Sequence, residues 1–85
     1  MYRIDITDCS KKFLEKIPKK DAEIILNKIY SLKEDPFKSL KRLKGYKLWR
    51  LRILKYRAII DMVISESRII ILRIGYRKNV YDNLP

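Results

Sequence analysis

Histidine is absent from this sequence, and its absence removes the side chain that proteins use most often for acid–base catalysis and for binding metal ions. The single cysteine, Cys9, allows neither an internal disulfide nor a thiolate metal cluster, and we expect it to be a small buried residue in a reducing compartment. No apolar run approaches the roughly 20 residues of a membrane span, and no apolar signal segment opens the chain. These absences predict a soluble cytoplasmic protein that works without a metal ion or another cofactor.

Acidic side chains are also scarce, above all in the middle of the chain. Lysine and arginine number 21 against 10 aspartate and glutamate residues, so the net charge is +11. No acidic residue lies between Asp35 and Asp61, whereas this interval holds a series of basic ones: Lys38, Lys41, Arg42, Lys44, Lys47, Arg50, Arg52, Lys55 and Arg57. Such a field attracts polyanions, and nucleic acid is the first candidate. The alternative for the lysines is a solvated surface that serves only solubility.

Hydrophobic periodicity predicts one short strand and two helices in the first half of a single domain, residues 1–85. Residues 2–7 alternate apolar and polar side chains, which is typical of a half-buried strand. Asp8 and Ser10 are both suitable N-caps for a first helix, which Pro18 ends. The second helix has the strongest pattern, with apolar side chains at helical spacing: Ala22, Ile25, Leu26, Ile29 and Leu32.

After a basic connector at residues 37–44, three segments alternate with a period of two and predict three strands. The alternation in the last strand sets one group of residues against another: Ile70, Leu72 and Ile74 against Ile71, Arg73 and Arg77. Short links at 54–55 and 65–67 predict an antiparallel meander. We therefore expect an α+β fold with two helices on one face of a four-stranded, mainly antiparallel sheet, in the order β-α-α-β-β-β. The position of the first strand in the sheet stays open.

The same alternation places five arginines on the sheet face away from the helices: Arg50, Arg52, Arg57, Arg73 and Arg77. Stability gives no reason for this cluster, because like charges on neighbouring strands repel each other. Guanidinium groups bind phosphate bidentately and stabilise the extra charge of a pentacovalent phosphate, and in RNA the 2′-hydroxyl can be the nucleophile. Four tyrosines near the arginines in sequence are candidates for stacking on a base or holding a hydroxyl: Tyr46, Tyr56, Tyr76 and Tyr81. Alternatively, the arginines only bind an acidic partner or have no function.

Four segments in a fixed order resemble the RelE/ParE toxin superfamily, in its RelE-like branch: Leu48-Trp49-Arg50-Leu51-Arg52, Tyr56-Arg57-Ala58-Ile59-Ile60, residues 69–74, and Gly75-Tyr76-Arg77-Lys78-Asn79-Val80-Tyr81. The preceding strand, the two helices and Asp35-Pro36 fit as well, so the resemblance covers nearly the whole chain. It implies the toxin of a type II toxin–antitoxin system that cleaves messenger RNA on the ribosome without a metal ion, leaving a 2′,3′-cyclic phosphate and a 5′-hydroxyl. It also implies an acidic, RelB-like antitoxin as partner in a hetero-oligomer.

The resemblance further implies roles for individual residues. Five would be catalytic: Arg57 as the grip on the scissile phosphate, Arg77 as the stabiliser of charge on the phosphate and leaving oxygen, Arg50 and Arg52 as a basic pair, and Tyr81 as the group that orients the 2′-hydroxyl or stacks on a base. A second group would bind RNA: Lys41, Arg42, Lys44, Lys47, Lys55, Arg73 and Tyr76. Arg73 enters this group by strand alternation alone.

This chain departs from the family at the basic pair, where relatives often have lysine. Arg50 and Arg52 do not lose a proton near neutral pH, so neither serves as a general base. The base is left open between a tyrosinate, a solvent molecule and no strong base at all. Two other functions stay open: a ParE-like inhibitor of DNA gyrase without nuclease activity, and an inactive RNA-binding module.

Overall fold

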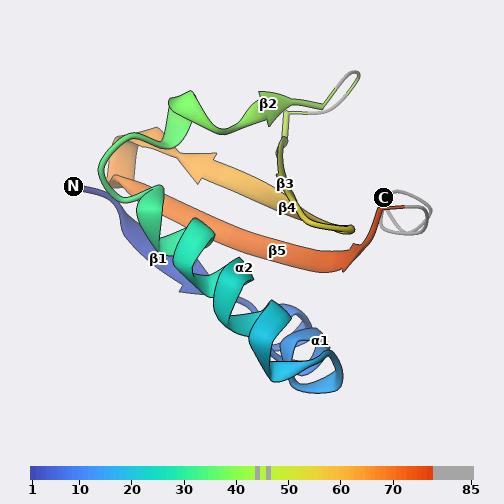
Figure 1. The fold of residues 1–85 in the computed structure, drawn as a ribbon. Coiled ribbons are helices and arrows are strands. Elements are labelled where there is room, and N and C mark those ends of the chain that lie inside the picture. Colours follow the sequence, from blue (N-terminus) through green and yellow to red (C-terminus); the bar gives the residue numbers. More distant parts are fainter. Residues whose placement is uncertain (44, 46, 78–85) are drawn as a thin grey trace.

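The computed structural model of this chain describes residues 1–43, 45 and 47–77. In chain order the elements are β1 (Arg3–Ile6), α1 (Asp8–Lys16), α2 (Lys19–Ser31), the 3₁₀ turn η1 (Pro36–Lys38), β2 (Lys41–Arg42), β3 (Trp49–Ile53), β4 (Tyr56–Val63), the 3₁₀ turn η2 (Ile64–Glu66) and β5 (Arg68–Tyr76). The strands form one sheet in the order β1-β5-β4-β3-β2, and both α-helices lie on one face of it (Figure 1). The predicted α+β class is confirmed.

The sheet has five strands where four were predicted, because the basic connector contributes one. Lys41 pairs with Arg50 and Arg42 with Trp49, so these two residues form β2 antiparallel to β3 at one edge of the sheet. At the other edge β1 lies parallel to β5. This is the position of the first strand, which the sequence left open. The β3-β4-β5 meander is antiparallel throughout, as expected from its short links.

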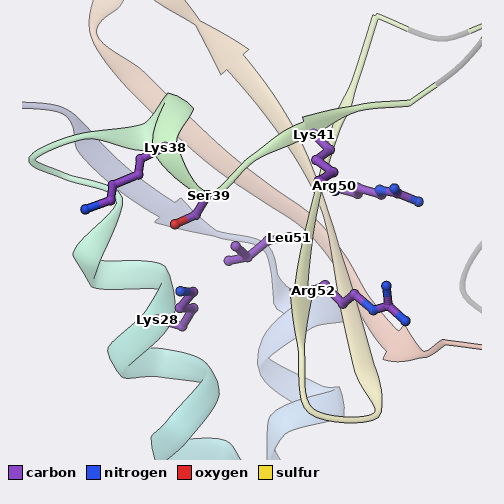
Figure 2. A pocket seen from close by; sticks show the side chains of 7 residues that line it. All are labelled: Lys28, Lys38, Ser39, Lys41, Arg50, Leu51 and Arg52. Atoms are coloured by element: carbon purple, nitrogen blue, oxygen red, sulfur yellow. The ribbon is translucent and has the colours of Figure 1, made fainter.

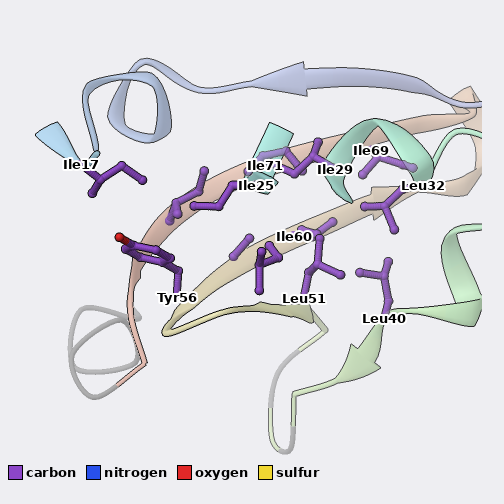
Figure 3. Packing of buried hydrophobic residues seen from close by; sticks show 13 residues of the cluster. Ile17, Ile25, Ile29, Leu32, Leu40, Leu51, Tyr56, Ile60, Ile69 and Ile71 are labelled. Atoms are coloured by element: carbon purple, nitrogen blue, oxygen red, sulfur yellow. The ribbon is translucent and has the colours of Figure 1, made fainter. Parts of the chain in front are cut away.

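The core lies between the helices and the sheet (Figure 3). Its most deeply buried side chains come from α2, the residue that follows it and the three long strands: Ile25, Ile29, Leu32, Leu51, Tyr56, Ala58, Ile60, Ile69 and Ile71. The i, i+4 spacing of Ile25 and Ile29 turns both toward the sheet, as the sequence predicted. Full burial of one such aliphatic side chain contributes about 1.5–3 kcal/mol to stability. This layer therefore holds the helices against one face of the sheet, and the opposite face carries other residues.

The first helix begins one residue earlier than its predicted caps. Thr7 is the N-cap, and its hydroxyl oxygen accepts a hydrogen bond from the backbone N–H of Ser10 at 3.3 Å. Ser10 is instead fully buried and its hydroxyl donates to the carbonyl of Ile71 at 3.0 Å. The expectation that Cys9 is buried is wrong, because it lies in the first turn of α1 on the exposed side.

A β-bulge in β5 changes the alternation predicted for the last strand. Ile59 pairs with Arg73 and Ile60 with Ile71, so one residue of β5, Leu72, is extra between these two pairs. Ile71 and Ile74 therefore both face the core, whereas the sequence pattern set them on opposite faces. Leu72 packs instead in a second, smaller cluster with Ile59.

In the part of the chain that the structure describes, neither helix is long and apolar enough to cross a lipid bilayer.

Candidate functional site

Strand register gathers arginines on the sheet face opposite the helices, which we call the arginine face. Leu51 and Ile53 point into the core, so the alternating Arg50 and Arg52 of β3 point the other way. Arg52 is paired with Arg57 of β4 across the ladder. Side chains of directly paired residues start about 4.5–5.5 Å apart at Cβ. The two strands therefore bring two guanidinium stems together.

Strand β5, on the other side of β4, adds further arginines to the same face. The bulge at Leu72 puts Arg73 opposite Ile59, and Gly75 lies opposite Arg57. The position paired with Arg57 on β5 thus carries no side chain. The backbone N–H of Arg77 donates to the carbonyl of Lys55 at 3.0 Å, so pairing continues past β5 and alternation directs Arg77 to this face.

The five arginines differ in how far they are buried. Arg50, Arg57 and Arg73 are half-buried, whereas Arg52 and Arg77 are exposed. The stems of the half-buried ones lie beside a small apolar cluster on the same face, formed by Leu43, Leu48, Ile59 and Leu72. Packing of the aliphatic part of arginine against apolar neighbours leaves the charged head toward solvent. The face therefore combines an apolar base with a row of cationic groups.

The far end of β5 shows how an arginine is neutralised in this sheet. Arg68 Nε donates to Asp5 Oδ2 at 2.8 Å, and its Nη1 donates to Glu66 Oε1 at 3.2 Å. The bond to Asp5, followed by that to Glu66, raises the pKa of Arg68 above its ordinary value. By contrast, the segment of chain that carries Arg50, Arg52 and Arg57 has no acidic residue between Asp35 and Asp61.

Two of the candidate tyrosines lie on the helix side of the sheet. Tyr56 is fully buried and donates from its hydroxyl to Asp21 Oδ2 at 2.6 Å. This hydrogen bond, together with burial and the negative charge of Asp21, raises the pKa of Tyr56 to about 12. Tyr76 pairs with Tyr56 and its ring lies 5.5 Å from that of Phe13 in α1. Both tyrosines therefore lie on the face opposite the arginine face.

A comparison with models of protein families identifies the family of this chain. A family model described as the ParE toxin of the type II toxin–antitoxin system, parDE, matches residues 4–81. The chain belongs to this toxin family. Its place in the RelE/ParE superfamily, expected from the ordered segments, is confirmed. A comparison with curated protein sequences gives no match.

Solved structures of RelE toxins share the fold of this toxin. RelE in the archaeal RelE–RelB complex of Pyrococcus horikoshii is 28% identical with a TM-score of 0.79, over 89% of this chain and 94% of that one. In the RelB–RelE complex of Methanococcus jannaschii the identity is 25% and the TM-score 0.74, over 95% and 99% of the two chains. A chain of the RelBE2 complex of Mycobacterium tuberculosis is 20% identical with a TM-score of 0.79, over 89% of this chain and 98% of that one. At this identity the similarity shows only that the fold is shared.

The remaining basic residues predicted to bind RNA occupy different parts of the toxin. Lys41 and Lys47 are exposed, and Lys41 is paired with Arg50. The guanidinium of Arg42 lies 5.3 Å from the ring centre of Trp49, and the ammonium of Lys55 lies 5.8 Å from that of Tyr56. The structure therefore turns Arg42 and Lys55 toward aromatic rings rather than into the arginine face. Three predicted residues, Lys44, Tyr46 and Tyr81, lie outside the described residues.

A cleft that the sequence did not reveal lies behind β3, between that strand, α2 and η1 (Figure 2). It has a volume of about 290 Å³ and these lining residues: Lys28, Lys38, Ser39, Lys41, Arg50, Leu51 and Arg52. Lys28 points into it from α2, whereas the side chains of Arg50 and Arg52 point away, toward the arginine face. Helical spacing alone predicts an exposed position for Lys28, and no local signal in the sequence indicates that it lies near β3.

Proposed function

We propose that this toxin is a metal-independent mRNA endonuclease that acts on the ribosome, in the cytoplasm, and that an acidic antitoxin holds it in check. The observation that carries the proposal is the arginine face, where Arg52 and Arg57 pair directly and Gly75 lies opposite Arg57. Like charges in direct pairing oppose folding, so this arrangement has no structural benefit. Guanidinium forks bind phosphate oxygens bidentately.

In the proposed reaction the RNA supplies its own nucleophile. The 2′-oxygen attacks the adjacent phosphorus, the bond from phosphorus to the 5′-oxygen breaks, and the products carry a 2′,3′-cyclic phosphate and a 5′-hydroxyl. The proton of the 2′-hydroxyl passes to solvent, and solvent returns a proton to the leaving oxygen. Arg57 and Arg77 hold the phosphate and stabilise its extra negative charge, while Arg50 and Arg52 align the backbone and the 2′-hydroxyl. Tyr81 is proposed to orient the nucleotide.

The proposed site works by alignment and charge rather than by a strong base. Arginine stays protonated at any pH at which the protein is folded. Tyr56 is next to Arg57 in sequence, but its side chain faces the core. Its pKa is raised to about 12, so its hydroxyl stays protonated near neutral pH. These facts argue against the arginines and Tyr56 as the general base, and in the proposed reaction solvent accepts the proton. The rate should then depend mainly on the geometry that the ribosome imposes on the messenger RNA.

A second candidate function is inhibition of DNA gyrase without RNA cleavage. It is favoured by the family model, which describes the ParE toxin of parDE systems. A gyrase inhibitor needs a binding surface but has no chemical use for directly paired arginines. The arginine face would then be a contact surface for an acidic partner.

One experiment separates these two functions. Purified toxin is added to an in vitro translation reaction, with and without ribosomes, and breaks in the messenger RNA are mapped by primer extension. We expect cuts within codons that require ribosomes, that vanish in Arg77→Ala, and that persist in the control Arg3→Ala, an exposed arginine of β1. Intact messenger RNA together with arrested gyrase in a parallel supercoiling assay would instead establish the ParE-like function.

A further inference from the structure

The cleft behind β3 has the charge and the size of an anion-binding site. Its lining residues include three lysines from three different elements: Lys28 of α2, Lys38 of η1 and Lys41 of β2. No acidic side chain is among the described residues that line it. Its volume of about 290 Å³ lies near the lower end of the range of about 300–1,000 Å³ that is typical of ligand pockets. The cleft is therefore large enough for a phosphate group and part of a sugar.

The polar groups of the cleft have no protein partner in the described part of the chain. The ion pairs of this part all involve Asp5 or Glu66, so none of them includes a lysine of the cleft. The hydroxyl of the half-buried Ser39 makes no hydrogen bond to a described residue. In Figure 2 the ammonium end of Lys28 points toward Ser39, with the apolar side chain of Leu51 beside them. An ammonium and a hydroxyl against an apolar wall bind an anion more strongly than they would in open water.

Stability accounts for only one of the three lysines. Lys28 lies in the last turn of α2, where a positive charge interacts favourably with the helix dipole. Lys38 belongs to a turn of three residues and Lys41 to an edge strand, and neither element has a comparable dipole. Like charges around one small cleft repel each other, and a bound anion would relieve this repulsion.

An aromatic group lies next to the cleft along both η1 and β3. Phe37 directly precedes Lys38, and 46% of its surface is exposed. Its ring centre lies 5.3 Å from that of Trp49, whose ring centre is also 5.3 Å from the guanidinium of Arg42. Trp49 is on the same face of β3 as Leu51, about 6.6 Å away along the strand. This spacing is similar to that between the base and the phosphate of one nucleotide.

We propose that the cleft and this aromatic group form a nucleotide subsite for an RNA strand, with a phosphate between Lys28 and Ser39 and a base on Phe37. The inference rests on the RNA substrate proposed above, and it extends the bound strand beyond the arginine face. Arg50 and Arg52 line the cleft while their side chains point to the arginine face, so β3 is a wall common to both sites (Figure 2). Cations interleaved with aromatic rings are typical of surfaces that bind single-stranded RNA.

The test measures binding of a labelled 12-nucleotide RNA with 2′-deoxy substitutions, which cannot be cut, by fluorescence anisotropy at several salt concentrations. Lys28→Gln removes the charge that points into the cleft, and Phe37→Leu removes the ring but keeps an apolar side chain. Both positions are exposed and lie outside the proposed catalytic residues. Lys20→Gln makes the same charge change at the other end of α2 and serves as the control. Arg57→Ala reports separately on the arginine face.

The two variants should have different signatures. We expect Lys28→Gln to weaken binding by about threefold at low salt and to reduce the salt slope by about 0.7, because one phosphate contact is lost. Phe37→Leu should weaken binding by about fivefold with an unchanged slope, because a stacked base carries no charge. Lys20→Gln should bind as the wild type does. In NMR spectra the backbone amide of Ser39 should shift when RNA is added to the wild type, and this shift should be smaller in Lys28→Gln.

Equal affinities and slopes for Lys28→Gln and Lys20→Gln, or a Ser39 amide that RNA leaves unmoved, would overturn the proposal. A Ser39 amide that responds to a glutamate-rich peptide but not to RNA would assign the cleft to an acidic protein instead. In each of these cases a loss of RNA binding in Arg57→Ala would still support the proposed function. A loss in Lys28→Gln but not in Arg57→Ala would do the reverse, since it would support the subsite and contradict RNA binding at the arginine face.

Discussion

The hydroxyl of Tyr56 links the sheet to α2 through a bond of 2.6 Å to Asp21, and this bond predicts a specific pH dependence. Tyr56→Phe should lower the free energy of unfolding by about 1–3 kcal/mol, because Asp21 loses its donor. The native pKa of about 12 lies above the ordinary value of 10.0, so the native state keeps a proton that the unfolded chain loses between these pH values. The stabilisation from Tyr56 is thus complete below pH 10 and is lost as the pH rises toward 12.

Urea unfolding of wild type and Tyr56→Phe between pH 7 and pH 11.5 measures this difference. The control is Tyr30→Phe, since Tyr30 is 46% exposed on α2. A gap between wild type and Tyr56→Phe that stays constant up to pH 11.5 would contradict the prediction.

The Arg52–Arg57 pair predicts the opposite kind of effect, in which a substitution removes function and leaves or improves stability. Arg52→Ala removes one of two like charges in direct pairing, so we expect the unfolding free energy to rise by a few tenths of a kcal/mol at low salt. The gain should disappear at high salt, where the repulsion is screened. Thermal unfolding at two salt concentrations gives the measurement. A salt-independent loss of stability would show that Arg52 is structural.

At the scale of elements, the β5 bulge connects the helix start to the arginine face. Thr7 Oγ1 lies 3.0 Å from the carbonyl oxygen of Ile71 and 2.9 Å from that of Leu72, so its proton donates at the bulge while its oxygen caps α1. Thr7→Val keeps the shape of the side chain and removes both functions. We expect it to lower the unfolding free energy by about 1–3 kcal/mol, with Thr7→Ser close to wild type because it keeps the hydroxyl.

The cleavage assay gives a second readout for the same pair of variants. Thr7→Val should also reduce cleavage, because the bulge sets which face Arg73 occupies. A valine variant that is as stable and as active as the serine variant would disprove the link.

The elements also show which parts of the fold a sequence can predict. The helices and the meander follow from local periodicity, and Arg50, Arg52 and Arg57 were placed correctly on one face because β3 and the first part of β4 alternate without interruption. The alternation of β5 failed at Leu72, since the bulge is fixed by tertiary hydrogen bonds from Thr7 and Ser10 rather than by residues of the strand. Tyr76 lies on the helix side of the sheet although it is next to Arg77 in sequence, because successive residues of a strand point to opposite faces.

Features formed by contacts between distant segments could not be predicted at all. The cleft between α2 and β3 depends on both elements, which only the packed core brings together. The two-residue strand β2 is too short to give a periodic signal, and it exists because β3 offers a partner. Both features therefore depend on the whole fold rather than on any one segment.

At the scale of the whole molecule, charge is distributed so that binding to RNA should depend steeply on salt. Residues 1–35 hold 8 basic and 7 acidic side chains, whereas residues 36–85 hold 13 and 3. If the five arginines of the arginine face each neutralise one phosphate, the logarithm of the binding constant for single-stranded RNA should fall against the logarithm of salt concentration with a slope of about −3.5. Arg77→Ala removes one such contact and should reduce the slope by about 0.7.

Fluorescence anisotropy with a labelled 12-nucleotide RNA that carries 2′-deoxy substitutions, so that it cannot be cut, measures this slope without interference from cleavage. Arg3→Ala is the matched control, because Arg3 lies 3.7 Å from Asp5 at the far edge of the sheet and should leave the slope unchanged. If Arg77→Ala and Arg3→Ala change the slope equally, binding follows from net charge alone, and the arginine face is not the RNA site. A loss confined to Arg77→Ala assigns the phosphate contacts to that face, since the two variants have the same net charge and differ only in where the charge was removed.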